Sequence, residues 1–226
     1  MTTTNELSTS PQSHIDRIKA GIWDIHEGVS NGMAQPAPDE DNIMKGTLPR
    51  FKYVNQLGQR FVMQAGFERI LARYLSHPFI GKVVTDRQFH APKAADDLRF
   101  FGRDAAQEPT LPATQKMLGF FEHTEARDPR LLLAIHYVIE GSNNGAMFIA
   151  QAVKKAYGLE GTDGTLHLQP YGKAIREEWA AFRSAFNSLE ISDELMTEMI
   201  AVGRETFHHM NAISAEAFAL PEVPQA

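Results

Sequence analysis

The sequence predicts an all-α protein made of one domain. Apolar residues recur at steps of three and four along most of the chain, and no run alternates apolar and polar residues for long enough to form a sheet. The length of 226 residues and the hydrophobic content of 43% suit one globular domain with a substantial core. We expect a helical domain over residues 13–220, preceded by a disordered tail at 1–12 and followed by a short tail at 221–226.

Two helices are expected in the first third of the chain. The first carries an apolar stripe formed by Ile15, Ile18, Ile22, Ile25 and Val29. A loop rich in Pro, Asp and Gly (MAQPAPDEDNIMKG) follows. Thr47 and Pro49 then open a long helix to about Leu75, because the missing N–H of proline costs little in a first turn.

The signals between residues 76 and 109 are weaker. The string HPFIGKVV suggests an extended connection, and AADDLRFFG suggests a short helix that ends at Gly102.

Four helices are expected in the rest of the chain, three of them with a recognisable N-cap. The caps are Thr110 before Leu111 and Pro112, Asp128 before Pro129, and Ser192 before Asp193 and Glu194. The fourth helix spans about 171–188, and Pro221 ends the last one.

Composition excludes several classes of function. The absence of cysteine rules out disulfides, zinc ribbons, iron–sulfur clusters and thiol nucleophiles. A net charge of -6 without basic runs argues against nucleic acid as a partner. Because no basic start leads into an apolar stretch and no window holds eighteen apolar residues, we expect a cytoplasmic protein without membrane insertion.

Three residues of the first helix form a line beside its isoleucine stripe. Lys19, Trp23 and His26 are four and three residues apart and therefore share one face. A lone histidine in such a place is most often a boundary residue bonded to a backbone carbonyl, and the alternative is a ligand for a metal.

The string GSNNG interrupts the apolar helix that follows Asp128. Glycine costs about 1 kcal/mol relative to alanine inside a helix, so Gly141 and Gly145 need compensation. They are four residues apart on one face, where they would let a flat molecule approach the backbone. Close helix packing with a kink is the alternative explanation.

Two further patterns contain residue types used in binding sites. Arg176, Trp179 and Arg183 recur at steps of three and four, and together with Lys19 they would suit a dicarboxylate, although solvated arginines are the commoner explanation. Separately, Glu205 and His208 have the Glu-x-x-His spacing of helical di-iron sites, with His136 and Glu140 as possible partners. Only one such string is present, whereas a di-iron cage uses two.

Taken in order, these segments resemble the haem oxygenases over about residues 13–218. GSNNGAMFIAQAVKKAYGL, at 141–159, aligns without gaps on the family's pattern of Gly-Asp-x-Ser-Gly-Gly-Gln followed by an amphipathic segment. AAFRSAFNSLE at 180–190 and DLRFFG at 97–102 are similar to two further family segments. The resemblance implies a haem-oxygenase-like multi-helical bundle.

The resemblance also implies roles for individual residues. His26 matches the axial ligand of the haem iron, Lys19 and Arg183 match residues that bind the haem propionates, and Phe207 matches a distal aromatic residue. Gly141 and Gly145 match the two glycines that face the haem.

The sequence departs from the family pattern at three positions. Ser142 replaces the distal aspartate that orders water in the family, and the nearby Asn143 and Asn144 are possible substitutes. Ser30 stands where an acid commonly orients the axial histidine, and Trp179 replaces a basic contact to a propionate.

The function implied is oxidative cleavage of haem b, as both cofactor and substrate, to biliverdin, carbon monoxide and ferrous iron. The reaction uses O2 and electrons from a redox partner protein, which is a ferredoxin, a flavodoxin or a reductase. Two alternatives stay open. One is a haem carrier or sensor that does not degrade haem, and the other is the di-iron oxidase suggested by Glu205 and His208.

Overall fold

A computed structural model of the chain describes residues 12–30 and 43–222, and within this part the side chains of 26–30 are not described. The tails predicted at 1–12 and 221–226 lie outside the described residues except for residues 12, 221 and 222. Helices joined by short 3₁₀ turns make up the described part, which holds no strand, so the all-α prediction is confirmed. The α-helices are α1 His14–Ser30, α3 Arg50–Leu71, α4 Ala91–Phe100, α5 Pro112–Arg127, α6 Leu132–Tyr157, α7 Ile175–Asn187 and α8 Asp193–Ala219.

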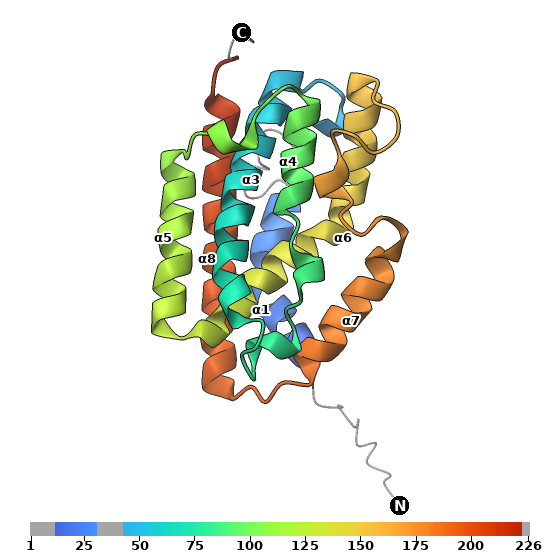
Figure 1. The fold of residues 1–226 in the computed structure, drawn as a ribbon. Helices are drawn as coiled ribbons and strands as arrows, with labels where there is room; N and C mark the ends of the chain where they lie inside the picture. The colour runs from blue at the N-terminus through green and yellow to red at the C-terminus, as the bar shows by residue number, and fades with distance from the viewer. Residues whose placement is uncertain (1–11, 31–42, 223–226) are drawn as a thin grey trace, which may run out of the picture.

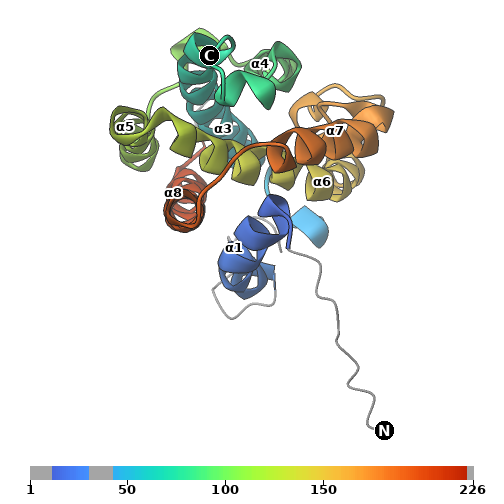
Figure 2. The ribbon, with the colours of Figure 1, turned by 90° about the horizontal axis from the view of Figure 1, so that it is seen from below.

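Helix α6 occupies the centre of the bundle. It runs obliquely between α5 and α8 on one side and α7 on the other, with α1 below it in the second view (Figures 1 and 2). All ten residues from 131 to 140 are buried, which explains why the run LLLAIHYVI shows no polar face. A helix covered on every side in this way fixes the positions of its neighbours.

The main core forms around this buried half of α6. From α1 it receives the isoleucine stripe, including Ile15, Ile18 and Ile22, and from α8 it receives Met199 and Val202. Each of these five side chains is buried. The core therefore holds α1 and α8 against α6, and this arrangement places the face of α1 that carries Lys19 near the second half of α6.

Several predicted helix ends are confirmed. Pro49 immediately precedes α3, and Gly102, with a φ of 76°, follows α4 in the left-handed conformation that glycine tolerates. Ser192 Oγ accepts a hydrogen bond from the N–H of Leu195 at the start of α8. Asp128 accepts one from the N–H of Arg130, at the start of the 3₁₀ turn that leads into α6.

Two local predictions are wrong. Leu111, not Thr110, is the N-cap of α5 and makes no side-chain capping bond, because Pro112 at the first helical position leaves one N–H fewer to satisfy. The segment HPFIGKVV is not extended, since it contains the 3₁₀ turn Ile80–Lys82, whose Ile80 side chain is completely buried.

No helix in the described part of the chain combines the length and the apolar character needed to cross a membrane.

Close packing of α1 against α8 generates a stability prediction. A Cβ atom at Gly21 would lie 2.6 Å from Ile200 Cγ2 and 2.8 Å from two more atoms of that side chain. Ile200 is β-branched and stiff at χ1, so Gly21→Ala should lower the free energy of unfolding by about 1–3 kcal/mol. Urea unfolding at pH 7 would measure this.

The matched control is Gly119→Ala in α5, where no atom lies within 4 Å of the added Cβ. The control should stabilise the protein by up to about 1 kcal/mol through helix propensity. Equal stabilisation by both substitutions would contradict the packing argument.

Candidate functional site

A cavity of about 680 Å³ lies where α1, α6, α7 and α8 meet. Eight of the residues that the family resemblance places at the haem site lie in its wall, namely Lys19, Gly141, Ser142, Asn144, Gly145, Trp179, Arg183 and Phe207. The structure therefore gathers residues that are nearly 190 positions apart into one wall. His26 belongs to α1, seven residues after Lys19, but its side chain lies outside the described residues.

The α6 side of the cavity is formed by backbone and small side chains. A Cβ atom added at Gly145 would meet no atom within 4 Å, and one at Gly141 would lie 3.7 Å from Trp179 Cη2. Neither glycine is required by close helix packing, which was the alternative explanation. Both instead leave the backbone of α6 open toward the cavity.

Helix α6 continues through GSNNG because polar side chains of this segment bond to the preceding turn. Ser142 Oγ donates to the carbonyl oxygen of Ile139 at 2.7 Å, and Asn144 Nδ2 donates to that of Gly141 at 3.1 Å. Such bonds to carbonyls one turn back are typical of short polar side chains within helices. The hydroxyl proton of Ser142 is thereby used within the helix.

Arg60 of α3 is a cavity residue that sequence reasoning missed. Its Nη2 donates to Ser142 Oγ at 3.3 Å, and its side chain lines the same wall. Burial lowers the pKa of this guanidinium, and the carboxylate of Glu140 partly opposes the shift. One arginine in a helix of mixed composition gives no sequence signal, so only its contact with Ser142 of α6 shows its place.

Two further cations lie at the wall formed by α1 and α7. Lys19 Nζ lies 4.8 Å from the centre of the Trp23 ring, and Arg183 is exposed on α7. Neither forms an ion pair with any carboxylate of the described residues. Asp16 also lines the wall and accepts a hydrogen bond from Ser13 Oγ at 2.7 Å. Both cations can therefore meet an anionic group of a ligand.

An aromatic group supports the same wall from α7. The ring of Trp179 stacks on that of Phe182, with centres 5.3 Å apart and planes 10° apart, and it lies 6.0 Å from the ring of Tyr137. The rings fix the orientation of Trp179 beside Gly141.

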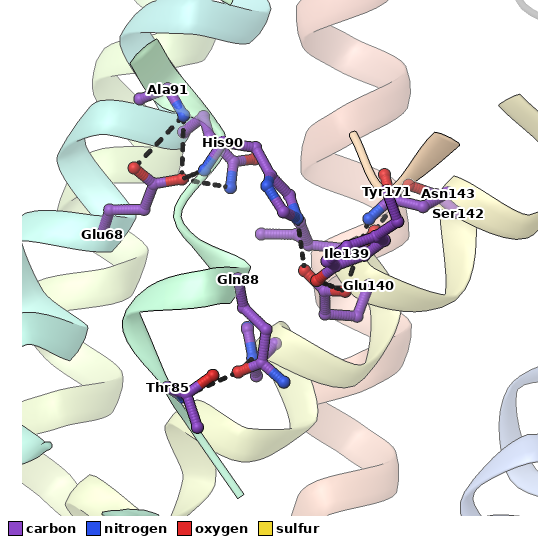
Figure 3. Close-up of polar contacts among 12 residues, drawn as sticks. Glu68, Thr85, Gln88, His90, Ala91, Ile139, Glu140, Ser142, Asn143 and Tyr171 are labelled. Carbon is purple, nitrogen blue, oxygen red and sulfur yellow. Dashed lines mark hydrogen bonds and ion pairs between the residues drawn. The ribbon is translucent and has the colours of Figure 1, made fainter. Parts of the chain in front are cut away.

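A buried polar cluster lies on the opposite face of α6 (Figure 3). Glu140 accepts a hydrogen bond from the hydroxyl of Tyr171 at 2.8 Å, and its other oxygen lies 3.2 Å from His90 Nε2. Glu68 accepts from the backbone N–H of Ala91 at 3.0 Å. Because Glu140 directly precedes Gly141 and Ser142, this cluster holds the point at which α6 passes from the core to the cavity.

Charges in this cluster are set by burial and by mutual contacts. Burial raises the pKa of Glu140, but the close contact with His90 Nε2, the nearby His136 and the hydrogen bond from Tyr171 outweigh it and leave the pKa below its ordinary value. Burial lowers the pKa of His136 to about 4, so this ring is neutral at pH 7. Its Nε2 lies 3.1 Å from the side-chain oxygen of Gln88, which accepts the hydrogen bond.

The structure does not bring together the four residues of the di-iron hypothesis. Glu205 and His208 are exposed on α8, whereas His136 and Glu140 are buried on α6. Across residues 12–30 and 43–222, no group of three or more metal-ligating side chains is suited to hold a metal ion.

The fold and the cavity define a class: a helical bundle with one broad site between its first helix and a glycine-containing central helix. Residues 33–216 match the heme oxygenase family, and the chain belongs to that family. The match begins after α1, so it does not include Lys19 or His26.

Solved structures of the same fold are similar over nearly the whole chain. The structure of heme oxygenase from Leptospira interrogans has a TM-score of 0.81 and 21% identity, covering 90% of this chain and 99% of that one. Heme oxygenase-1 from the cyanobacterium Synechocystis sp. PCC6803, in complex with heme, has a TM-score of 0.81 and 18% identity, covering 90% and 91%. No curated protein matches the chain in sequence.

The buried His136 generates a prediction on pH dependence. Its pKa is about 4 in the folded protein and about 6.5 in the unfolded chain, so only the unfolded chain takes up a proton as the pH falls below 6.5. The contribution of the neutral His136 to the free energy of unfolding is fully present above pH 6.5. The free energy of unfolding should therefore fall by roughly 2 kcal/mol between pH 7 and 5.

His136→Gln should remove this component, while a Gln side chain still offers a donor to Gln88. Urea unfolding at pH 7, 6 and 5 would compare the two proteins, and this range lies above the titration of Glu140. Identical pH profiles for wild type and variant would refute the assignment.

Proposed function

We propose that this chain binds haem in the 680 Å³ cavity and cleaves it oxidatively to biliverdin, carbon monoxide and ferrous iron. The observation that carries the proposal is the convergence of the eight sequence-predicted residues, from four helices, on one cavity wall. Membership of the heme oxygenase family supports a haem-degrading enzyme at the level of the family.

The residues in the wall fit a flat dianionic ligand. Gly141 and Gly145 leave the backbone of α6 uncovered, which allows a planar macrocycle to lie against it. Lys19 and Arg183 supply two cations for the propionates, and neither is engaged by a carboxylate of the described residues. The volume falls within the range of roughly 300–1,000 Å³ found for small-molecule and cofactor sites.

In this proposal each part of the wall has a separate task. His26 on α1 would supply a nitrogen ligand to the haem iron, and Lys19 and Arg183 would hold the propionates. The bound haem supplies the iron that activates O2 with electrons from an external ferredoxin, flavodoxin or reductase. The α6 backbone restricts the space above the opposite face of the ring.

Proton supply on that face differs from the pattern that the family resemblance implies. Ser142 cannot carry the negative charge of an aspartate, and its proton is already donated to Ile139. Arg60 is the group that presents N–H donors beside it. This arrangement specifically favours a second candidate, a haem-binding protein that does not turn over.

Reaction with a reductant separates the two candidates. We expect the full chain, loaded with ferric haem and given ascorbate or reduced ferredoxin in air, to lose its Soret band and to yield extractable biliverdin. Ser142→Asp should increase the biliverdin yield under the same electron supply, because a carboxylate at this place would pair with Arg60 and hold water.

The control is His26→Ala, which should alter the spectrum of the haem complex before any reductant is added. A stable Soret band under reduction would support the carrier. The absence of any Soret band would contradict both candidates.

A second prediction concerns Gly145. Since no atom lies within 4 Å of the added Cβ, Gly145→Ala should raise the free energy of unfolding of the ligand-free chain by up to about 1 kcal/mol. The same methyl group would occupy the space of the ring, so haem affinity should fall at least about tenfold. Thermal unfolding and haem titration would measure the two effects.

Gly145→Ala should therefore raise the free energy of unfolding and lower the affinity for haem. An unchanged haem affinity would remove the α6 face of the cavity from the haem site.

A further inference from the structure

A second, smaller cavity of about 210 Å³ adjoins the first. The two walls share Arg60 and His167 together with residues from α6, α8 and the segment after α6. The rest of the smaller wall is largely apolar and includes Leu48, Leu57 and Ile213. Arg60 and His167 are thus polar groups at the junction of a broad cavity with a small apolar one.

His167 is held in a fixed tautomer and orientation. Its Nδ1 lies 2.7 Å from Asp97 Oδ2, and the same carboxylate accepts the backbone N–H groups of Leu166 at 2.9 Å and His167 at 2.8 Å. Because a carboxylate can only accept, Nδ1 carries the proton and Nε2 has a free lone pair. Nε2 makes no hydrogen bond to a described residue. Since it is not a fully buried atom either, it reaches accessible space.

His167 is also kept neutral. Burial lowers the pKa of its imidazole, the carboxylate of Asp97 opposes this shift, and the charge of Arg60 adds to it. Arg60 and His167 line the same two cavities.

Arg60 supplies the complementary group. Among the described residues its one hydrogen bond is to Ser142 Oγ, a neutral acceptor, and it forms no ion pair. A guanidinium has five N–H donors, so most of them remain for a ligand. The two groups together suit a small acid. The neutral imidazole can accept the proton of the acid, and the guanidinium can pair with the anion that remains.

We propose that Arg60 and His167 form a binding subsite for a small weak acid, H–X. On binding, the H–X bond breaks, the proton forms an N–H bond with His167 Nε2, and the anion X⁻ pairs with the Arg60 guanidinium. No electron is transferred, and Asp97 positions the ring and stabilises the imidazolium. The subsite consists of protein groups alone, so it stands separately from the proposed reaction with haem.

The groups around His167 leave this ring as the site of proton uptake near neutral pH. Asp97 faces it from α4, and Arg60 and Tyr53 face it from α3, the ring of Tyr53 at 6.1 Å. Burial raises the pKa of Tyr53 well above its ordinary value, so it stays neutral, and Arg60 stays charged. Ligand binding should therefore be linked to one proton.

Azide is the probe for the test, because it is small, linear and ionised near neutral pH. Titration of the full, haem-free chain with sodium azide would be followed by calorimetry at pH 6.5, 7.25 and 8. Since the anion must bring one proton to His167, affinity should fall about tenfold for each pH unit.

Three variants at Arg60 and His167, together with one control variant, assign this effect to its residues. Arg60→Gln should weaken azide binding at least about tenfold, and Arg60→Lys should restore part of the loss. His167→Gln keeps an N–H donor for Asp97 and should abolish the pH dependence. As a control, Arg69→Gln removes one exposed charge of the same kind on α3, away from both cavities, and should change nothing.

The proposal is overturned if wild type binds no azide, if its affinity is independent of pH, or if Arg60→Gln binds as wild type does. Haem added in parallel tests the proposed function separately. A missing Soret band together with pH-linked azide binding would remove the haem reaction and leave the subsite in place.

Discussion

Complete burial of the first half of α6 is the constraint on which the rest of the structure depends. Residues 131–140 are covered on every side, so α1, α7 and α8 must pack around this helix rather than beside it. The helix then continues without a break into its glycine-containing second half. The same helix therefore organises the core at one end and forms a cavity wall at the other.

Helix α6 changes from a buried core helix to a cavity wall within one turn. Glu140 and the residues around it form a polar cluster on the core side (Figure 3). On the cavity side, Ser142 Oγ accepts a hydrogen bond from Arg60. Buried polar groups are costly unless they are paired, so such a cluster specifies one position for the helix. Precise placement of α6 is what a ligand lying against its backbone requires.

Charge in the cavity is opposite to the charge of the whole chain. The protein carries a net charge of -6, yet Lys19, Arg60 and Arg183 all line the cavity. Lys19 and Arg183 lie at the wall formed by α1 and α7, whereas Arg60 of α3 lies beside Ser142 of α6. Two cations are thus placed to bind the acidic groups of a ligand, and the third is placed apart from them.

Sequence alone predicted the parts of this structure that depend on local pattern. The isoleucine stripe of α1 and the Ser192 cap follow from spacing and propensity, and the place of Gly141 beside a cavity followed from its helical periodicity. Arg60 and His167 could not be predicted, because their roles arise from contacts between α3, α4 and the segment after α6. The Thr110 cap failed because Pro112 starts the helix without one.

The most direct test of the central claim is a crystal structure of the chain with ferric haem. The account predicts the ring between α1 and α6, with His26 coordinating the iron, the propionates at Lys19 and Arg183, and the opposite face against Gly141 and Gly145. A ring bound outside this cavity, or iron coordinated by another residue in place of His26, would contradict it.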